Sequence, residues 1–221
     1  MKYKIKPALT IIDMQNGFAA RGGSFDKLGY DINKYRSTVP AIKKIYQRTK
    51  ELNIPVFFSQ ALREKSGIDM LDKSHKILPL KRRERIRKLP ICVRGTWDSE
   101  LISDLKSQED DHIVQKRRDS IFQDTEFELW LRALGIDTIM FSGIDTSICV
   151  ESSLRDAFNR GWDVILISDA TASLSDEAYK TTLTEVMENF GLVMDSDELF
   201  NNLKKIGNKL FSLDVNQFKG I

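Results

Sequence analysis

Short runs of apolar and β-branched residues recur along the chain, and a longer amphipathic stretch follows most of them. The runs lie at residues 8–12, 54–59, 113–114, 138–142 and 164–167, and the third is the weakest. Each run is continuously apolar rather than alternating, which is typical of strands covered on both faces in a parallel sheet. We therefore expect these runs to form the strands of one sheet.

The stretches between the runs carry apolar residues at helical spacing. Four such stripes lie within residues 40–52, 127–134, 150–158 and 183–190. Pro40 suits the first turn of the first helix, and a glycine follows each of the other three, as expected at helix ends. Alternation of strands and helices predicts right-handed crossovers and a doubly wound α/β sheet. Because no repeat, linker or shift in composition divides the chain, we expect a single domain over residues 1–221.

Composition and charge narrow the classes of function. The chain is 41 % hydrophobic and 30 % charged, and its 34 basic and 32 acidic side chains leave a formal net charge of +2. Proteins dedicated to nucleic acids or membrane surfaces usually show a larger or more segregated imbalance. No run approaches the roughly 18 apolar residues of a membrane helix, and residues 1–7 lack the apolar core of a signal peptide. We expect a cytoplasmic protein whose partner is a small molecule, with no nucleic acid and no membrane.

The region from Arg63 to Lys88 departs from the strand–helix rhythm, and its residues 81–88 are strongly basic. One interpretation is a patch for anions or nucleic acid. The other is a solvated insertion over the sheet edge, or a contact between subunits. The second is favoured, because no aromatic residues are interleaved and the total charge is balanced.

Three reactive side chains directly follow predicted strands. Asp13 follows the first strand, Lys116 the third, and Cys149 lies near the start of the helix after the fourth. In an open parallel sheet, ligands bind outside the carboxyl ends of the strands, so these groups should converge at one edge. The other cysteine, Cys92, lies in the apolar run 89–93, and we expect it to be a core thiol in a strand. Two cysteines are too few for a disulfide framework.

Physical chemistry suggests a role for each of the three. A helix N-terminus and a facing Lys116 would lower the pKa of the Cys149 thiol, and the thiolate is the nucleophilic form. Asp13 is placed to take the thiol proton and return it to a leaving nitrogen. Backbone N–H groups of the turn from Asp145 to Cys149 are placed to stabilise an oxyanion.

Several segments match a known family in order and spacing. They are residues 8–18, 94–98, 115–122, 143–157 and 169–173, with the sequences ALTIIDMQNGF, RGTWD, QKRRDSIF, GIDTSICVESSLRDA and DATAS. Through them the chain resembles the isochorismatase-like cysteine hydrolases from about Ala8 to about Leu199.

The resemblance implies a three-layer αβα Rossmann-like sandwich with a mostly parallel sheet. It also implies a catalytic triad, which falls on Asp13, Lys116 and Cys149 here. A cis peptide bond between Ile144 and Asp145 is implied as well, and it would direct the N–H groups of Asp145 and Cys149 toward an oxyanion. Relatives are commonly dimers or tetramers, so a homodimer or homotetramer is expected.

Departures from the family pattern narrow the choice. Metal-binding relatives carry an Asp-x-His motif after the second strand, where this chain has residues 59–63, SQALR. The histidines, His75 and His112, do not have that spacing, so we expect no metal and no other cofactor. The segment 149–157 is more similar to the branch acting on carbamoyl or ureido compounds. Asp145 stands where many relatives have a small residue, and its carboxylate either faces the pocket or points away.

The leading hypothesis is a metal-independent cysteine amidohydrolase that cleaves a C–N bond of a small amide, carbamoyl or ureido substrate through a thioester on Cys149. By position, Gln60, Arg63, Trp97 and Arg118 are candidates for substrate binding, with Arg118 as a partner for a carboxylate.

Two alternatives remain. The first is hydrolysis of a vinyl ether such as isochorismate, although some subgroups with that activity lack the nucleophile that Cys149 supplies. The second is a catalytically silent scaffold or nucleotide-binding module. Residues 13–17, DMQNG, match neither a dinucleotide fingerprint nor a P-loop, which weakens that second alternative.

Overall fold

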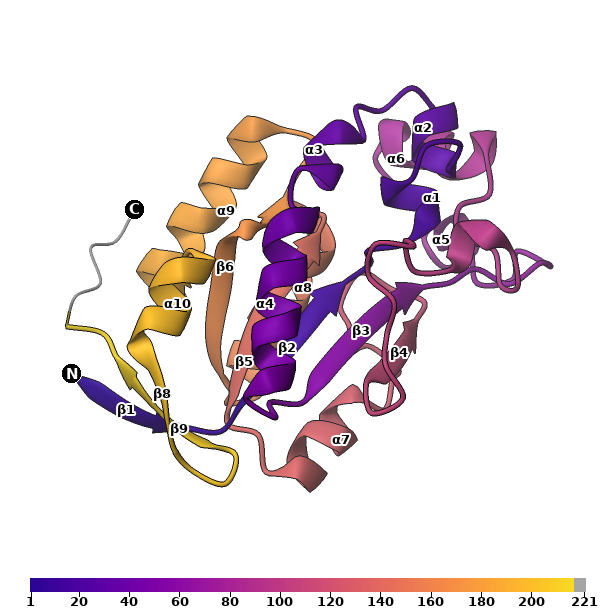
Figure 1. The fold of residues 1–221 in the computed structure, drawn as a ribbon. Coiled ribbons are helices and arrows are strands. Elements are labelled where there is room, and N and C mark those ends of the chain that lie inside the picture. The colour runs from indigo at the N-terminus through magenta and orange to yellow at the C-terminus, as the bar shows by residue number, and fades with distance from the viewer. Residues whose placement is uncertain (217–221) are drawn as a thin grey trace.

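A computed structural model describes residues 1–216; the last five residues of the predicted domain, 217–221, lie outside the described residues. Within residues 1–216, six parallel strands form a central sheet in the order β4-β3-β2-β5-β6-β7 (Figure 1). The strands are β2 (Pro7–Ile12), β3 (Val56–Ala61), β4 (His112–Lys116), β5 (Thr138–Ile144), β6 (Asp163–Ala172) and β7 (Leu192–Met194). The five predicted runs correspond to β2 through β6, and β7 was not predicted.

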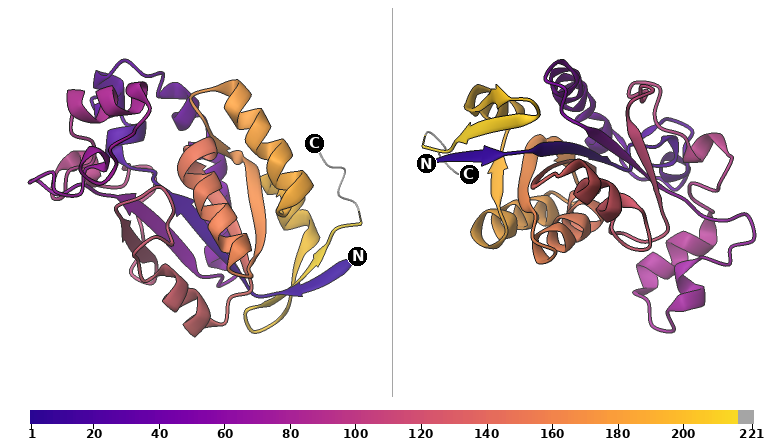
Figure 2. Two further views of the ribbon diagram at one scale, coloured as in Figure 1. Left: turned by 180° about the vertical axis from the view of Figure 1, so that it is seen from behind. Right: turned by 90° about the horizontal axis from the view of Figure 1, so that it is seen from below.

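Helices cover both faces of this sheet (Figure 2). On one face lie α4 (Val39–Glu51) and α10 (Ser196–Asn202). On the other lie α7 (Phe127–Leu134), α8 (Glu151–Asn159) and α9 (Asp176–Asn189). The three-layer αβα architecture with a parallel sheet is therefore confirmed.

The continuous apolar runs have a direct structural reason. Successive side chains of a strand point to opposite faces, so most positions of a strand between two helix layers are buried and apolar. In β2, Leu9 and Ile11 pack into the core beneath α4, whereas Ala8 and Ile12 pack into the core beneath α7 and α8.

The chain enters the sheet at β2, builds β3 and β4 on one side, and then crosses back to β5 on the other side of β2. The connection through α4 lies on one face and the connection through α7 on the other. This change of direction opens a crevice at the carboxyl ends of β2 and β5, which is where ligands bind in such sheets.

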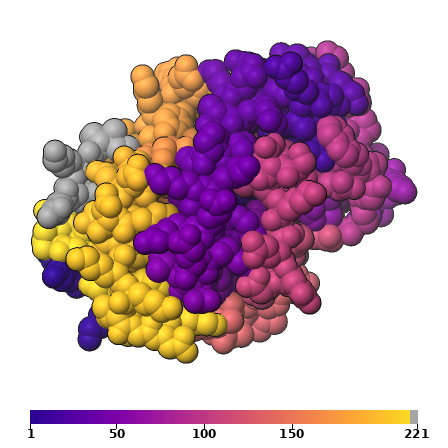
Figure 3. All heavy atoms as spheres, viewed as in Figure 1, coloured from indigo at the N-terminus to yellow at the C-terminus, as the bar shows by residue number. Residues whose placement is uncertain are grey.

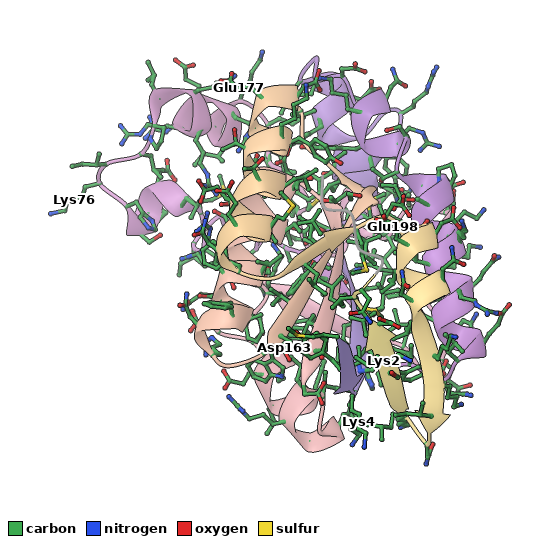
Figure 4. All side chains as sticks on the ribbon, turned by 90° about the vertical axis from the view of Figure 1, so that its left-hand side faces the viewer. Lys2, Lys4, Lys76, Asp163, Glu177 and Glu198 are labelled. Atoms are coloured by element: carbon green, nitrogen blue, oxygen red, sulfur yellow. The ribbon has the colours of Figure 1, made fainter. Side chains whose placement is uncertain are left out.

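Short helices gather over these carboxyl ends (Figure 1). They are α1 (Asn16–Ala19), α2 (Ser24–Lys27), α3 (Asn33–Arg36), α5 (Leu71–Ser74), α6 (Leu80–Lys88) and the 3₁₀ turn η1 (Trp97–Ser99). The loop between α5 and α6 extends away from the sheet, with Lys76 on its outer side (Figure 4). Helix α6 contains the basic segment and buries none of its residues.

A small antiparallel sheet joins the two ends of the chain, in the order β1-β9-β8. It consists of β1 (Lys2–Ile5), β8 (Leu203–Gly207) and β9 (Leu210–Asp214), and it was not predicted. In Figure 3 the yellow C-terminal segment lies at the opposite side of the visible face from the segment around α6.

Cys92 is buried as predicted, but it does not lie in a strand. Its φ of +53° places it in a bend, and its N–H donates to the Asp98 carboxylate over 2.7 Å. That hydrogen bond turns the chain where the apolar run predicted an extended segment. Within residues 1–216, no helix combines the length and apolar character required to cross a bilayer.

Candidate active site

A cavity of about 620 Å³ opens at the carboxyl ends of the central strands, and Asp13, Lys116 and Cys149 all line it. These three side chains come from segments more than 30 residues apart in the sequence. The structure thus brings the three predicted catalytic residues to one place.

Asp13 directly follows β2 and is buried. Its φ of +51° lies in the left-handed region, which aspartate tolerates better than most residues. The Ser59 hydroxyl donates to Asp13 Oδ1 over 2.6 Å and accepts from the Asp13 N–H over 3.0 Å. Ser59 was not predicted as a site residue. Its signal was a hydroxyl inside the apolar run of β3, one residue beyond the pair Ile11 and Phe58 in the strand register.

Lys116 is the last residue of β4 and is fully buried. Its ammonium lies 2.7 Å from Asp13 Oδ2 and donates to the carbonyl oxygens of Arg118 and Asp119 over 3.1 and 2.9 Å. Two carbonyl oxygens and one carboxylate oxygen therefore surround the ammonium. Burial opposes the charge, but the Asp13 carboxylate, together with Cys149 and Asp119, outweighs it and raises the pKa of Lys116, so the side chain is a cation.

Cys149 lies in a π-helical turn, Thr146–Val150, that leads into α8, and its side chain is partly open to the cavity. Its carbonyl accepts a hydrogen bond from the Ser153 hydroxyl over 2.6 Å. Burial raises the pKa of the thiol, and Asp13 adds to the rise by its charge and by a hydrogen bond, whereas Lys116 opposes it. The expectation of a lowered pKa is therefore wrong, because desolvation and Asp13 together outweigh the nearby cation.

The carbonyl of Asp145 organises this turn. The N–H groups of Ile148 and Val150 both donate to it over 3.1 Å. The peptide bond between Ile144 and Asp145 is cis. Of the two residues whose N–H groups are the predicted oxyanion donors, Asp145 thus caps this turn and Cys149 is its next-to-last residue.

The Asp145 carboxylate lines the cavity but is saturated with hydrogen bonds. Its Oδ1 accepts from the N–H and the hydroxyl of Ser147 and from the hydroxyl of Ser173, over 2.8–2.9 Å. Its Oδ2 accepts from the Tyr35 hydroxyl over 2.7 Å and from the Leu174 N–H over 3.2 Å. Burial, reinforced by this carboxylate, raises the pKa of Tyr35, so the phenol is the donor.

Gly143 lets β5 approach β2 closely beside the site. Its φ is +99°, and a Cβ at this position would lie 2.2 Å from the carbonyl oxygen of Ile12. No side chain fits there, since the obstacle is backbone. Asp13 directly follows β2 and Asp145 directly follows β5. The close contact between these two strands therefore sets the position of Asp145 relative to Asp13.

The four predicted substrate-binding residues divide into two pairs. Arg63 and Arg118 line the cavity, but both guanidinium groups donate to backbone carbonyls, Arg63 to Leu62 and Arg117, and Arg118 to Asp69 and Arg117. Gln60 and Trp97 instead line a separate hollow. The structure therefore does not bring Gln60 and Trp97 to the cavity that contains Cys149.

Helix α6 supplies cavity residues that sequence analysis did not assign. One terminal nitrogen of Arg82, Nη2, donates to both carboxylate oxygens of Asp119, at 2.6 and 2.7 Å. Although burial opposes it, this pairing holds the pKa of Asp119 below its usual value. Arg85 also lines the cavity, with its guanidinium 5.6 Å from the centre of the Phe25 ring. The basic run was visible in the sequence, but the sequence did not show that it reaches this cavity.

Neither histidine lines the cavity. His112 stacks on Phe57, and His75 contacts Ser74. In the described part of the chain, no group of three or more His, Cys, Asp or Glu side chains is arranged to hold a metal ion.

Comparison with known proteins gives consistent results. The model of the isochorismatase domain matches residues 7–198. A ureidoacrylate amidohydrolase, RutB, of Agrobacterium fabrum is 32 % identical over 194 residues, which is 84 % of this chain and 85 % of that protein.

Solved structures are similar to this chain in fold. An isochorismatase-like hydrolase from Alkaliphilus metalliredigens is 31 % identical, with a TM-score of 0.73 over 88 % of this chain and 97 % of that one. An N-carbamoylsarcosine amidase from Thermoplasma acidophilum is 27 % identical, with a TM-score of 0.68 over 87 % of this chain and 98 % of that one.

Proposed function

This chain belongs to the isochorismatase family and is a hydrolase of non-peptide C–N bonds, and we propose that it acts through a covalent thioester on Cys149 without a metal ion. The proposed substrate is an amide, carbamoyl or ureido compound. The observation that carries the proposal is the juxtaposition of a thiol with a buried carboxylate–ammonium pair at one cavity.

Because the pKa of Cys149 is raised, the first step requires a base that removes the thiol proton. The resting thiol is neutral, so Asp13 removes its proton as the sulfur attacks the substrate carbonyl carbon. An S–C bond forms and the carbonyl electron pair moves to oxygen. The N–H groups of Asp145 and Cys149 are the proposed donors to that oxyanion.

Collapse of the tetrahedral adduct breaks the C–N bond. Asp13 gives its proton to the leaving nitrogen, which departs as ammonia or an amine, and a thioester remains. Asp13 then takes a proton from water as the water oxygen attacks the thioester carbon. The S–C bond breaks, and the sulfur recovers the proton from Asp13. The Lys116 ammonium lies 2.7 Å from the Asp13 carboxylate and so holds it in place between these transfers.

Metal independence rests on the residues near the cavity. At the end of β3, where metal-binding relatives have an Asp-x-His motif, Ser59 bonds to Asp13 and Gln60 bonds to the Ser99 carbonyl. The Lys116 ammonium supplies a positive charge beside the thiol without any metal.

The experiment that tests this proposal uses the two cysteines as a matched pair. Ammonia release is measured for a panel of amides and N-carbamoyl acids with the wild type, Cys149→Ala and Cys92→Ala. We expect Cys149→Ala to abolish turnover and Cys92→Ala to retain it, because Cys92 is buried and does not line the cavity. Mass spectrometry of acid-quenched reactions should find the acyl or carbamoyl group on Cys149.

Undiminished ammonia release by Cys149→Ala would refute the thioester mechanism. Pyruvate release from isochorismate that survives this substitution would favour vinyl-ether hydrolysis instead. Absence of turnover and of any adduct across the panel would favour a silent scaffold.

Location and assembly complete the proposal. We propose a cytoplasmic protein, in line with the two free thiols at Cys92 and Cys149. We also propose a homodimer or homotetramer that binds a small molecule rather than nucleic acid or a membrane. Light scattering on the purified protein tests the assembly, and a monomer at all concentrations would contradict it.

A further inference from the structure

Some of the charged side chains that line the cavity have partners within residues 1–216, and others do not. In the described part of the chain, six cationic and four anionic side chains line it. Lys116 is paired with Asp13 and Arg82 with Asp119. The guanidinium groups of Arg63 and Arg118 donate to backbone carbonyls.

Arg85 and the exposed Lys81 differ from these cations, because neither forms an ion pair within residues 1–216, and of the two only Arg85 contacts an aromatic residue of the cavity wall. Within residues 1–216, the Arg85 guanidinium has no carboxylate within ion-pair distance and donates no hydrogen bond, and its one ring contact is with Phe25, at 5.6 Å. A cation–π contact uses none of the guanidinium N–H groups as hydrogen-bond donors to a carboxylate, so they remain available to a bidentate acceptor. Arg85 also opposes the rise in the pKa of Tyr35, which lines the same cavity.

The wall next to Arg85 is aromatic. The ring of Phe25 lies 5.0 Å from Phe18, 4.8 Å from Tyr30 and 6.2 Å from Tyr35, and all four residues line the cavity. Met70 and Ile86 add further apolar surface from the segment that contains α5 and α6. A volume of about 620 Å³ falls within the range of about 300–1,000 Å³ that buries a drug-sized ligand.

We propose that the substrate is an amphipathic acid with a bulky apolar body, whose carboxylate binds Arg85 while its scissile group lies at Cys149. The aromatic wall made by Phe18, Phe25, Tyr30 and Tyr35 receives the body. This inference rests on the proposed function, and it names the class of amide or carbamoyl compound that the site selects. Arg85 is then the proposed specificity-determining residue in place of Arg118, whose guanidinium donates to the carbonyls of Asp69 and Arg117.

Three probe compounds separate the two parts of this recognition. N-carbamoylphenylalanine has the carbamoyl group, the aromatic body and the carboxylate. Phenethylurea lacks only the carboxylate, and N-carbamoylglycine lacks only the body. Binding of each is measured by calorimetry on the Cys149→Ala protein, so the result does not depend on turnover.

We expect N-carbamoylphenylalanine to bind at least about tenfold more tightly than either truncated compound, since each lacks one of the two interactions. Adding Arg85→Gln should weaken binding of N-carbamoylphenylalanine about tenfold to a hundredfold and leave phenethylurea within about twofold. The control is Arg87→Gln on the same helix, whose side chain pairs with Asp72 outside the cavity. It removes the same charge and should leave all three affinities unchanged.

Equal weakening of the acid and of phenethylurea by Arg85→Gln would overturn the assignment, because it would indicate a structural role for Arg85. Equal binding of N-carbamoylglycine and N-carbamoylphenylalanine would overturn the proposal that the aromatic wall binds an apolar body of the substrate. Ammonia release by the otherwise wild-type enzyme is measured in parallel. Selective binding without turnover would contradict the proposed chemistry and support the proposed recognition by Arg85. Turnover that Arg85→Gln does not change would support the chemistry and contradict the recognition.

Discussion

The Lys116 ammonium lies 2.7 Å from the Asp13 carboxylate, and neither side chain is more than 2 % exposed. A buried ion pair of this kind depends on both partners, since either charge alone would be left desolvated and uncompensated. Its location beside the candidate nucleophile couples the stability of the protein to its chemistry.

Replacing Lys116 with Met should lower the free energy of unfolding by about 3–5 kcal/mol, because it leaves the Asp13 carboxylate buried without its cation. Urea unfolding measures the loss, and ammonia release should fall by at least about a hundredfold. The double variant Asp13→Asn/Lys116→Met is the control, and it should recover much of the stability but none of the activity. Equal stability of the single and double variants would contradict the coupling.

Asp13→Asn should move thiol reactivity and turnover in opposite directions. The substitution removes the carboxylate that raises the pKa of Cys149 and leaves Lys116, which lowers it. Iodoacetamide should therefore alkylate Cys149 faster than in the wild type at the same pH, while ammonia release falls by about 10²–10⁴-fold without the base. Peptide mapping separates Cys149 from the buried Cys92. Slower alkylation in the variant would show that Asp13 does not suppress the thiolate.

The stability of the protein should decrease in alkaline solution because of Cys149. Its folded-state pKa is raised, so the folded protein retains the proton that the unfolded chain loses above about pH 8.5. The stabilisation is therefore present below that pH and is lost as the pH rises, by about 1.4 kcal/mol per pH unit. Urea unfolding across this range should give a shallower decline for Cys149→Ala, and an identical slope would contradict this expectation.

Gly143→Ala should destabilise the protein more than Gly161→Ala. Both glycines have φ near +90°, at +99° and +91°, so both substitutions introduce backbone strain. At Gly143 the new Cβ would also meet the Ile12 backbone, whereas at Gly161 it would meet open space. The additional loss at Gly143 should be about 1–3 kcal/mol in urea unfolding, accompanied by loss of activity. Equal losses at the two sites would show that the contact with Ile12 relaxes freely.

The central strands were predictable because burial on both faces leaves a continuous apolar run, as in Ala8 to Ile12. The edge strand β7 was missed because Leu192–Met194 is too short to show a pattern. The pairing of β1 with β9 joins residues about 200 positions apart, and such pairing leaves no local signal.

In the candidate site, too, the positions of residues relative to the strands were predictable, but their contacts in the folded chain were not. Asp13, Lys116 and Cys149 lie at or beyond the carboxyl ends of strands, so topology alone predicts that they converge. The direction of the pKa shift at Cys149 was not predictable, because it depends on burial and on the relative closeness of Asp13 and Lys116. Arg85 lies in a basic run like many solvated ones, and only the folded chain shows that this member of the run faces the cavity and Phe25.

The Asp145 carboxylate joins α3, the exit of β6 and the turn that contains Cys149, through Tyr35, Ser173 and Ser147. A change in the cavity wall at Tyr35 therefore also changes a support of the nucleophile turn. A substitution at Tyr35 should therefore alter both the substrates that fit the cavity and the reactivity of Cys149. Laboratory evolution toward larger substrates should consequently favour changes on α6, which has no buried residues, before changes at Tyr35.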